Sequence, residues 1–361
     1  METNFDAIKL AVESVTGGKN TVIFDDLGNP SIMVRIPKFK ISDVISGGSN
    51  SVHPAFIVNG VEVDEIFISK YQNIVVNDRA YSLPMQDPRA YITFDQAKTA
   101  CENKGSGWHL MTNAEWSAIA LWCKKNGYFP RGNNNYGKDH AYPHETGVET
   151  YEYNGRTGRV GTGSGPVTWA HDGTNSGIYD LNGNVWEWVG GLRLKDGEIQ
   201  VVADNNAAVT GTDMSATSTL WKAISKTGEL VAPGSANTLK LDYTSAPGTS
   251  GTKGVAKVVT TLTNQQTVED VYSAGEFESL TADTSITIPE IMKALCLYPS
   301  GDKDNHGDYI YMRNIGERLP FRGGSFFTTS TRYGVFALNL GDVRSISDFT
   351  LGVRSAFIDI Q

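Results

Sequence analysis

The chain opens with a helical pattern of apolar residues and continues with an extended one. Apolar positions between residues 5 and 15 recur at the spacing of a helix face, and a pair of glycines ends the pattern. Apolar runs at 21–24 and 31–36 flank a polar turn, which predicts two strands. A Gly/Ser-rich stretch follows them at 46–51, so these elements predict a small amino-terminal module over residues 1–50.

Two helices have clear start signals. Thr93 with Gln96, and Thr112 with Glu115, have the spacing of capping boxes, in which two side chains satisfy free backbone N–H groups at a helix start. The apolar residues after each box keep a helical period, and Gly127 lies where the second helix should end. We therefore expect two capped helices in the first half of the chain.

Strand patterns surround these helices. Asn59-Gly60 and Asp196-Gly197 each lie between apolar runs, and such dipeptides favour two-residue hairpin turns. Trp186 and Trp188 would share one face of a strand and bury together, with Glu187 on the other face. Helices mixed with hairpins predict an α+β fold.

The composition changes in the second half of the chain. From Ala203 to about Gly316 it is rich in Thr, Ser, Ala and Gly, and the Gly/aromatic style of the preceding part returns at Arg322. We interpret 203–316 as a large insertion in one domain over residues 51–361.

Charge and targeting signals restrict the classes of partner. The chain has 31 Lys and Arg against 40 Asp and Glu, a formal net charge of -9, which disfavours binding to nucleic acid or an anionic membrane. The first residues lack the pattern of a secretory signal, and no apolar run is long enough to insert in a membrane. We expect synthesis in the cytoplasm without a signal peptide.

Catalytic chemistry has little support in the residue pattern. Three cysteines are too few for a disulfide framework, and no Ser or Cys nucleophile has an assignable base. The terminal stretch 322–357 mixes small polar and aromatic residues, which suits either an adaptable contact surface or an ordinary core hairpin.

Four segments in order resemble one family. "ITFDQAKTAC", "WHLMTNAEWSAIA", "GIYDLNGNVWEW" and "FRGGSF…GVR" resemble the formylglycine-generating, sulfatase-modifying branch of the C-type lectin fold, over about residues 55–190 and 318–361. The resemblance implies a C-type lectin fold and an oxidoreductase with paired cysteines in its terminal segment. This chain has no cysteine from Leu297 to Gln361, which disfavours the enzyme.

The ending resembles a second branch of the fold more closely, the variable proteins of diversity-generating retroelements, which include phage tail-tip receptor-binding proteins. The similarity lies in the framework segments 322–324, 334–340, 344–345 and 352–356. In that family, mutagenesis directed at adenines changes chosen codons, and the fold displays the altered side chains as a ligand-binding face. The resemblance implies a variable region over residues 322–357.

Twelve positions match the diversified ones of that family. Val335, Phe336 and Leu338 lie between two groups of these positions, and we expect them to be buried. We expect Arg322 and Arg354 to hold the two ends of the stretch 322–357 by hydrogen bonds to carboxylates or carbonyls. The positions implied as ligand-binding are Phe327, Thr328, Ser330, Thr331, Arg332, Tyr333, Gly341, Asp342, Ile346, Asp348, Phe349 and Thr350.

The resemblance also implies a metal site. The family's enzymes bind calcium around the segment that matches "DLNGNVWE". By position, the ligands of a structural Ca²⁺ would be the side chains of Asp180 and Glu187 and the carbonyls of Gly183 and Val185. No cofactor is required for binding of a ligand.

Together these patterns predict a ligand- or receptor-binding protein with a diversified carboxyl-terminal surface, located in a phage or prophage virion tail. The expected partners are a host-surface protein or other macromolecular ligand, other tail components, and two further copies in a homotrimer. The first 50 residues would attach the protein to the particle or to those copies. The alternatives are a formylglycine-generating type oxidoreductase and a structural tail protein without a ligand.

Overall fold

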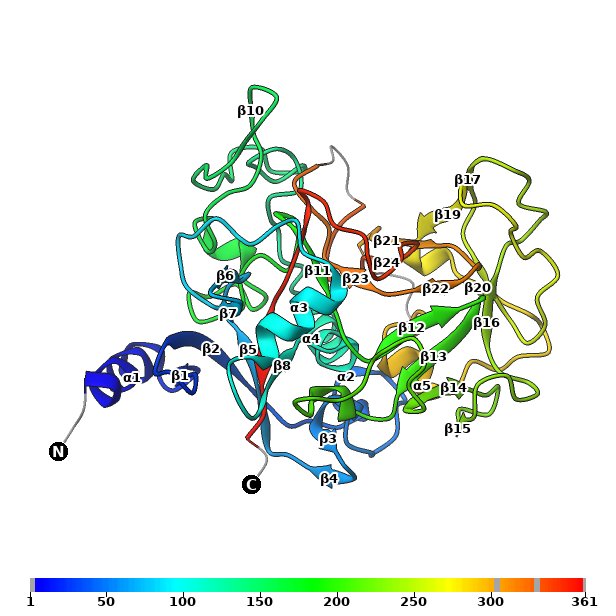
Figure 1. Ribbon diagram of the computed structural model, residues 1–361, viewed down its shortest axis with the longest axis horizontal. Helices are drawn as coiled ribbons and strands as arrows, with labels where there is room; N and C mark the ends of the chain where they lie inside the picture. The colour runs from blue at the N-terminus through cyan, green and yellow to red at the C-terminus, as the bar shows by residue number, and fades with distance from the viewer. Residues whose placement is uncertain (1–3, 302–305, 328–331, 360–361) are drawn as a thin grey trace.

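A computed structural model describes residues 4–301, 306–327 and 332–359 (Figure 1). Its first sheet joins strands from both ends of the chain, in the order β1-β2-β5-β26-β8. Strand β26, near the carboxyl terminus, lies antiparallel between β5 and β8. The bounds are β1 Asn20–Phe24, β2 Pro30–Pro37, β5 Glu65–Ser69, β8 Trp108–Leu110 and β26 Ser355–Phe357.

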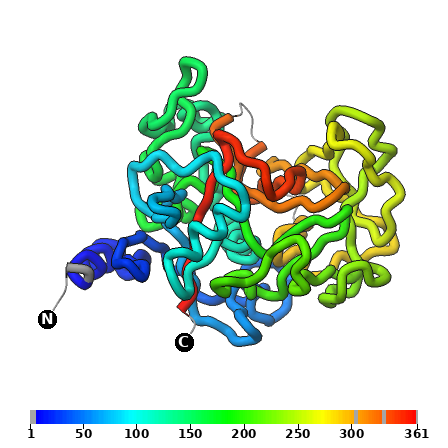
Figure 2. The backbone as a smooth tube through the Cα atoms, in the orientation of Figure 1, coloured from blue at the N-terminus to red at the C-terminus, as the bar shows by residue number. Residues whose placement is uncertain are grey.

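This sheet corrects the predicted boundary at residue 50. Strand β2 pairs with β5 over five residue pairs, from Met33 with Ser69 to Pro37 with Glu65. Residues 20–37 are therefore part of the same sheet as the carboxyl-terminal strand and do not form a separate module. Helix α1, Asn4–Thr16, projects from one side of the body (Figure 2). Its residues Ile8, Leu10 and Val15 are exposed.

Both predicted capping boxes are confirmed. The Thr93 hydroxyl accepts from the backbone N–H of Gln96 at the start of α3, Phe94–Glu102. The Thr112 hydroxyl accepts from the N–H of Glu115 at the start of α4, Asn113–Asn126, which ends at Gly127 with φ 70°. The shorter helices are α2 Ile41–Val44 and α5 Glu290–Ala294. None of the helices in the described residues is long and apolar enough to cross a membrane.

A seven-stranded sheet carries the terminal framework, in the order β17-β19-β21-β24-β23-β11-β25. Strand β11 contains the predicted pair Trp186 and Trp188, and both pack against Phe321 in one core cluster. Three strands from the predicted insertion extend this sheet beside β24. The bounds are β11 Trp186–Trp188, β17 Gly251–Lys253, β19 Val271–Glu276, β21 Tyr309–Met312, β23 Phe321–Arg322, β24 Leu338–Leu340 and β25 Leu351–Gly352.

An eight-stranded sheet contains five of the strands of the insertion, β14, β15, β16, β18 and β20. It grows from the hairpin of β12 and β13, whose turn at Asp196-Gly197 has φ values of 47° and 83°, as the dipeptide predicted. Its strands are β12 Leu192–Lys195, β13 Glu198–Val202, β14 Trp221–Ile224, β15 Leu230–Val231, β16 Lys240–Asp242, β18 Lys257–Val259, β20 Thr281–Ala282 and β22 Glu317–Arg318.

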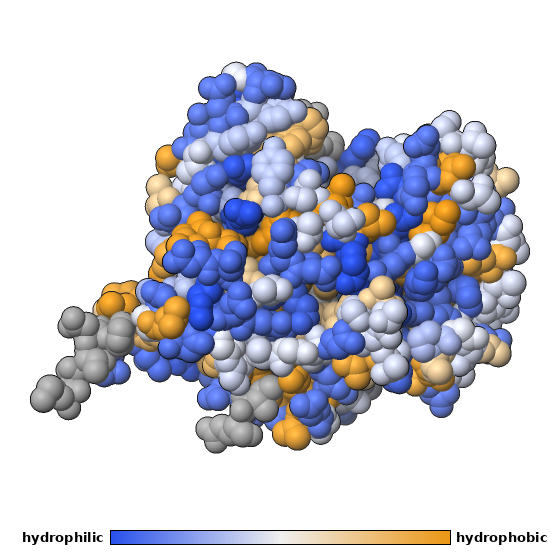
Figure 3. Space-filling model, viewed as in Figure 1, coloured by the Kyte–Doolittle hydropathy of each residue, from blue (hydrophilic) through white to orange (hydrophobic). Residues whose placement is uncertain are grey.

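Three short hairpins lie outside these sheets. The Asn59-Gly60 turn joins β3 and β4 as predicted, although the second strand is shorter than its apolar run. The hairpins are β3 Ile57–Val58 with β4 Val61–Glu62, β6 Ile74–Val76 with β7 Arg79–Tyr81, and β9 Glu152–Tyr153 with β10 Arg156–Thr157. Sheets with few helices make an α+β fold, as predicted, and apolar residues are scattered over its mainly hydrophilic face in Figure 3.

Candidate ligand-binding face

A buried arginine holds the start of the terminal stretch. Arg322 in β23 has no exposed surface, and its Nε and Nη2 donate to Asn113 Oδ1 at 2.9 and 2.8 Å. Nη2 also donates to the carbonyl of Cys296 at 3.1 Å. These contacts confirm the prediction that Arg322 holds the start of the stretch, and its burial leaves it no exposed surface.

A second buried arginine holds the end of the stretch. Arg354 donates from Nε to Glu187 Oε2 at 2.6 Å and from Nη2 to Oε1 at 2.8 Å. It also donates to the carbonyls of Ser69 and Tyr179. Since the side chains of Arg354 and Glu187 are 0% and 1% exposed, this pair forms in the protein interior.

The framework between the two arginines is buried. Val335, Phe336 and Leu338 are at most 2% exposed, as predicted. The Val335 carbonyl accepts from the Trp116 indole at 2.7 Å, and the Phe336 N–H donates to Asp308 Oδ2 at 2.7 Å. Burial raises the pKa of the Asp308 carboxyl to about 7. These contacts therefore fix the framework segment that lies between the variable positions.

Four aromatic side chains gather above this framework. The ring of Phe327 lies 5.3 Å from that of Phe349 and 5.2 Å from that of Tyr153, measured between centroids. Tyr153 stacks on Phe349 at 4.8 Å with 9° between the rings, and Tyr136 lies 5.9 Å from Phe327. Phe327 is 43% exposed and the other three are half-buried. We call Tyr136, Tyr153, Phe327 and Phe349 the aromatic face.

The β9–β10 hairpin supplies part of this face, at the top of Figure 1. Tyr153 belongs to β9, and Arg156 of β10 places its guanidinium 3.3 Å from the centre of the Tyr136 ring. Arg159 lies 4.0 Å from the Tyr151 ring and pairs with Asp87. The sequence reasoning missed these residues, and the only signal was the richness of the segment in tyrosine.

The remaining predicted positions divide into four groups. Arg332 is exposed, whereas Tyr333, Asp342, Ile346 and Asp348 are half-buried. Gly341 and Thr350 are buried and leave a ligand almost no surface, which corrects the expectation that they contact it directly. Thr328, Ser330 and Thr331 lie outside the described residues.

The oxygens of the predicted calcium site converge on a nitrogen atom. Gln72 Nε2 donates to the carbonyls of Asp180, Gly183 and Val185 and to Glu187 Oε1, at 3.1, 3.2, 2.9 and 2.9 Å. An amide NH₂ carries only two hydrogens, fewer than the four oxygen acceptors around it. The arrangement of the oxygens therefore resembles that of a cation site, with the amide nitrogen in the position of the cation. Gln72 has no exposed surface.

Two features make this cage a poor fit for Ca²⁺. Arg354 already pairs with both oxygens of Glu187. One oxygen of the Asp180 side chain, predicted as a ligand, accepts from the N–H of Gly163 at 2.8 Å, and the other is buried without a partner among the described residues. It is the Asp180 carbonyl that faces Gln72. Among the described residues, no three His, Cys, Asp or Glu side chains form a metal cluster. The residues present fit an amide and a guanidinium better than a divalent ion.

We expect chelation to leave the protein unchanged. Adding a calcium chelator to the purified chain should not shift its melting temperature, because Gln72 already occupies the centre of the oxygens. Gln72→Ala should lower the free energy of unfolding by about 1–3 kcal/mol, since buried acceptors lose their donor. Stoichiometric bound calcium, or a melting temperature that falls on chelation, would contradict this expectation.

The chain is similar to a known protein family. The profile described as "Sulfatase-modifying factor enzyme 1-like domain" matches residues 10–227. No curated protein matches.

Three solved structures are similar at low identity. PvdO from Pseudomonas aeruginosa is 19% identical over 47% of this chain and 74% of its own, with a TM-score of 0.26. Treponema denticola variable protein 1 is 13% identical over 94% of this chain and 98% of its own, with a TM-score of 0.33. The Major Tropism Determinant U1 variant is 11% identical over 94% of this chain and 71% of its own, with a TM-score of 0.31. TM-scores this low support no conclusion about function, so the functional argument depends on the residues of the chain itself.

Proposed function

We propose that this chain, which belongs to the sulfatase-modifying factor enzyme 1-like family and has its C-type lectin-like fold, is a ligand-binding protein and not an enzyme. The observation that carries the proposal is the aromatic face, which stands on a framework held by two buried arginines. Aromatic side chains are common anchors of interfaces, and a rigid scaffold with exposed loops is a usual way to present them.

The cysteines argue against the family's enzymatic activity. Cys101, Cys123 and Cys296 are buried, and burial raises the pKa of each thiol. Because no cysteine lies in residues 297–361, the terminal segment lacks the thiol pair that the resemblance implies for catalysis. Turnover of a sulfatase-type cysteine peptide by the purified chain would restore the enzyme alternative.

The recognition face that we propose consists of the aromatic face together with Arg332, Tyr333, Asp342, Ile346 and Asp348. It is smaller than one side of a standard protein interface, about 20–30 residues, so a single copy should bind modestly. Display on a homotrimer in a virion tail would strengthen binding through avidity. Helix α1 with its exposed apolar residues is the contact that we propose between copies or with the particle, and a monomeric mass in sedimentation would refute the trimer.

The function can be tested by sequencing the terminal codons of this gene across a population. We expect adenine-linked changes at the variable positions of the recognition face, such as Phe327, Tyr333 and Phe349. The codons of Arg322 and Arg354 should stay constant, because their side chains hold the framework. A uniform sequence at the exposed positions would contradict diversification and favour a fixed receptor-binding or structural tail protein.

A further inference from the structure

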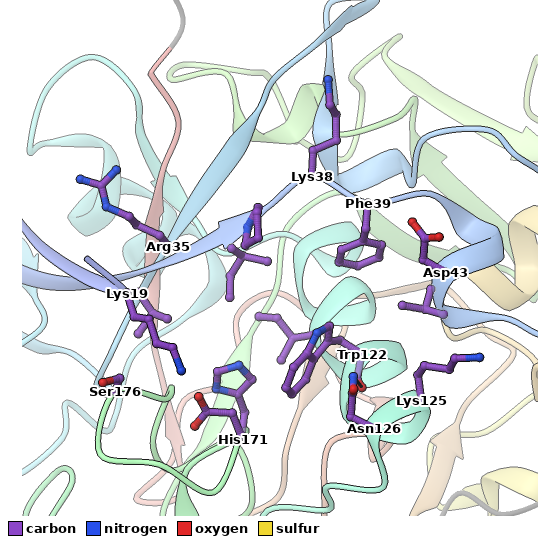
Figure 4. A pocket seen from close by; sticks show the side chains of 16 residues that line it. Lys19, Arg35, Lys38, Phe39, Asp43, Trp122, Lys125, Asn126, His171 and Ser176 are labelled. Carbon is purple, nitrogen blue, oxygen red and sulfur yellow. Dashed lines mark hydrogen bonds between the residues drawn. The ribbon is translucent and has the colours of Figure 1, made fainter. Parts of the chain in front are cut away.

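A second candidate binding site lies between strand β2 and helix α4. The cavity has a volume of about 540 Å³, within the range of about 300–1,000 Å³ that is typical of small-molecule sites (Figure 4). Val34 and Ile36 of β2 and Ile119 and Trp122 of α4 give it an apolar lining. None of the residues that line it belongs to the recognition face.

His171 brings a polar group into this apolar cavity. The residue is 6% exposed, and its Nδ1 accepts from the backbone N–H of Ile178 at 2.8 Å. Burial lowers the pKa of the imidazole to about 4, so at neutral pH the ring is uncharged and carries its proton on Nε2. No described residue accepts a hydrogen bond from Nε2, and this atom is not one of the fully buried polar atoms of the described chain, so the N–H opens on the cavity, where a ligand can accept from it.

Aromatic rings surround His171 in the cavity. The imidazole lies 5.3 Å from the Trp122 ring, between centroids, with 50° between the planes. The Trp122 ring in turn stacks on Tyr128 at 6.1 Å. Figure 4 shows the rings of Trp122, His171 and Phe39 around one space. A planar ring system would find large apolar contacts there.

Positive charge at the rim is only partly compensated. Arg35 pairs with Glu13 and Glu65, and Lys38 pairs with Glu62 and Asp64. Lys19 has no ion pair with any described residue, and Figure 4 shows its side chain extending toward His171. The carboxylates that line the cavity are those of Asp43 and Asp172, and Asp172 accepts from Thr174.

We propose that this cavity binds a small molecule that joins a flat apolar ring system to a carboxylate. The rings would lie against Trp122, while the carboxylate would accept from His171 Nε2–H and from the ammonium group of Lys19. A single negative charge suits the site, because Asp172 beside His171 would repel a more highly charged group. This site is independent of the recognition face and of its proposed function.

The experiment uses the full chain and two probes of the same ring system, 2-naphthoate and neutral 2-naphthalenemethanol, in isothermal titration calorimetry. We expect saturable one-to-one binding of the naphthoate and much weaker binding of the alcohol. Lys19→Glu should weaken naphthoate binding at least tenfold, because it reverses the charge that the carboxylate meets. Lys226→Glu, an exposed lysine outside the cavity, is the matched control and should leave binding unchanged.

A second variant tests the aromatic rings around His171. Trp122→Leu should weaken binding of both probes, while Lys19→Glu should affect the naphthoate alone. The proposal is wrong if the naphthoate shows no saturable binding at millimolar concentration. It is also wrong if both probes bind equally, or if Lys19→Glu and Lys226→Glu behave alike.

Discussion

Arg354→Ala is expected to lower the free energy of unfolding by about 3–5 kcal/mol, because removing one partner of a buried ion pair leaves the other charge unpaired. Glu187 would keep its carboxylate at 1% exposure without the two hydrogen bonds from the guanidinium. The carbonyls of Ser69 and Tyr179 would lose their donor as well. Urea denaturation, followed by tryptophan fluorescence, measures the change directly.

Two further variants separate the cost of the unpaired charge from that of the lost side chain. The double variant Arg354→Met with Glu187→Leu removes both charges and should be less destabilised than Arg354→Ala. Lys257→Ala breaks a partly exposed pair with Asp283 and should cost less than about 1 kcal/mol. If Arg354→Ala cost no more than Lys257→Ala, Arg354 would not hold the framework.

Elements with local signals could be predicted from the sequence. The capping boxes at Thr93 and Thr112 and the turn at Asp196-Gly197 depend on residues within four positions of one another. Each also needs a specific residue type, such as glycine where φ is positive. For this reason the structure confirms them at nearly the predicted residues.

Elements that depend on distant pairing could not be predicted. Nothing local in residues 20–37 shows that they share a sheet with β26, because the pairing is decided by which apolar faces can be buried together. For the same reason the sequence did not predict strand β21 of the insertion, which pairs with β24 of the terminal framework. The change in composition predicted that the insertion is distinct from the rest of the domain. In the structure, strands of the insertion are hydrogen-bonded to strands of that domain.

The candidate site was predicted in part. Resemblance located Phe327 and Phe349, whereas the stacking of Tyr153 on Phe349 joins residues nearly 200 positions apart and is visible only in the fold. Matching of motifs likewise gave the oxygens of Asp180 and Glu187 but not Gln72, which fills the space between them. A local motif identifies the oxygens that lie near one another along the chain. It does not show that a side chain distant in sequence, here that of Gln72, lies between them.

Two neighbouring phenylalanines give the clearest test of the proposed face. Phe326 has no exposed surface, and its ring contacts those of Tyr151, Phe327 and Phe349 from below. Phe326→Ala should therefore lower the free energy of unfolding by about 3–5 kcal/mol, since it leaves a cavity under the face. Phe327→Ala removes a ring that is 43% exposed and should cost no more than about 1 kcal/mol.

The two variants can be compared directly because both replace a phenylalanine by alanine at adjacent positions. The effect of the substitution on backbone propensity is therefore nearly the same in both, and the difference between the two free energies of unfolding reports the difference in packing. Chemical denaturation of both variants gives the two free energies, and an unchanged m-value would show that the extent of unfolding is the same. Equal costs would mean that Phe327 is core packing, and the face would lose its most exposed anchor. A small cost for Phe327→Ala would leave no structural reason for this ring to lie at the surface, which is the position expected of a residue kept for contact with a ligand.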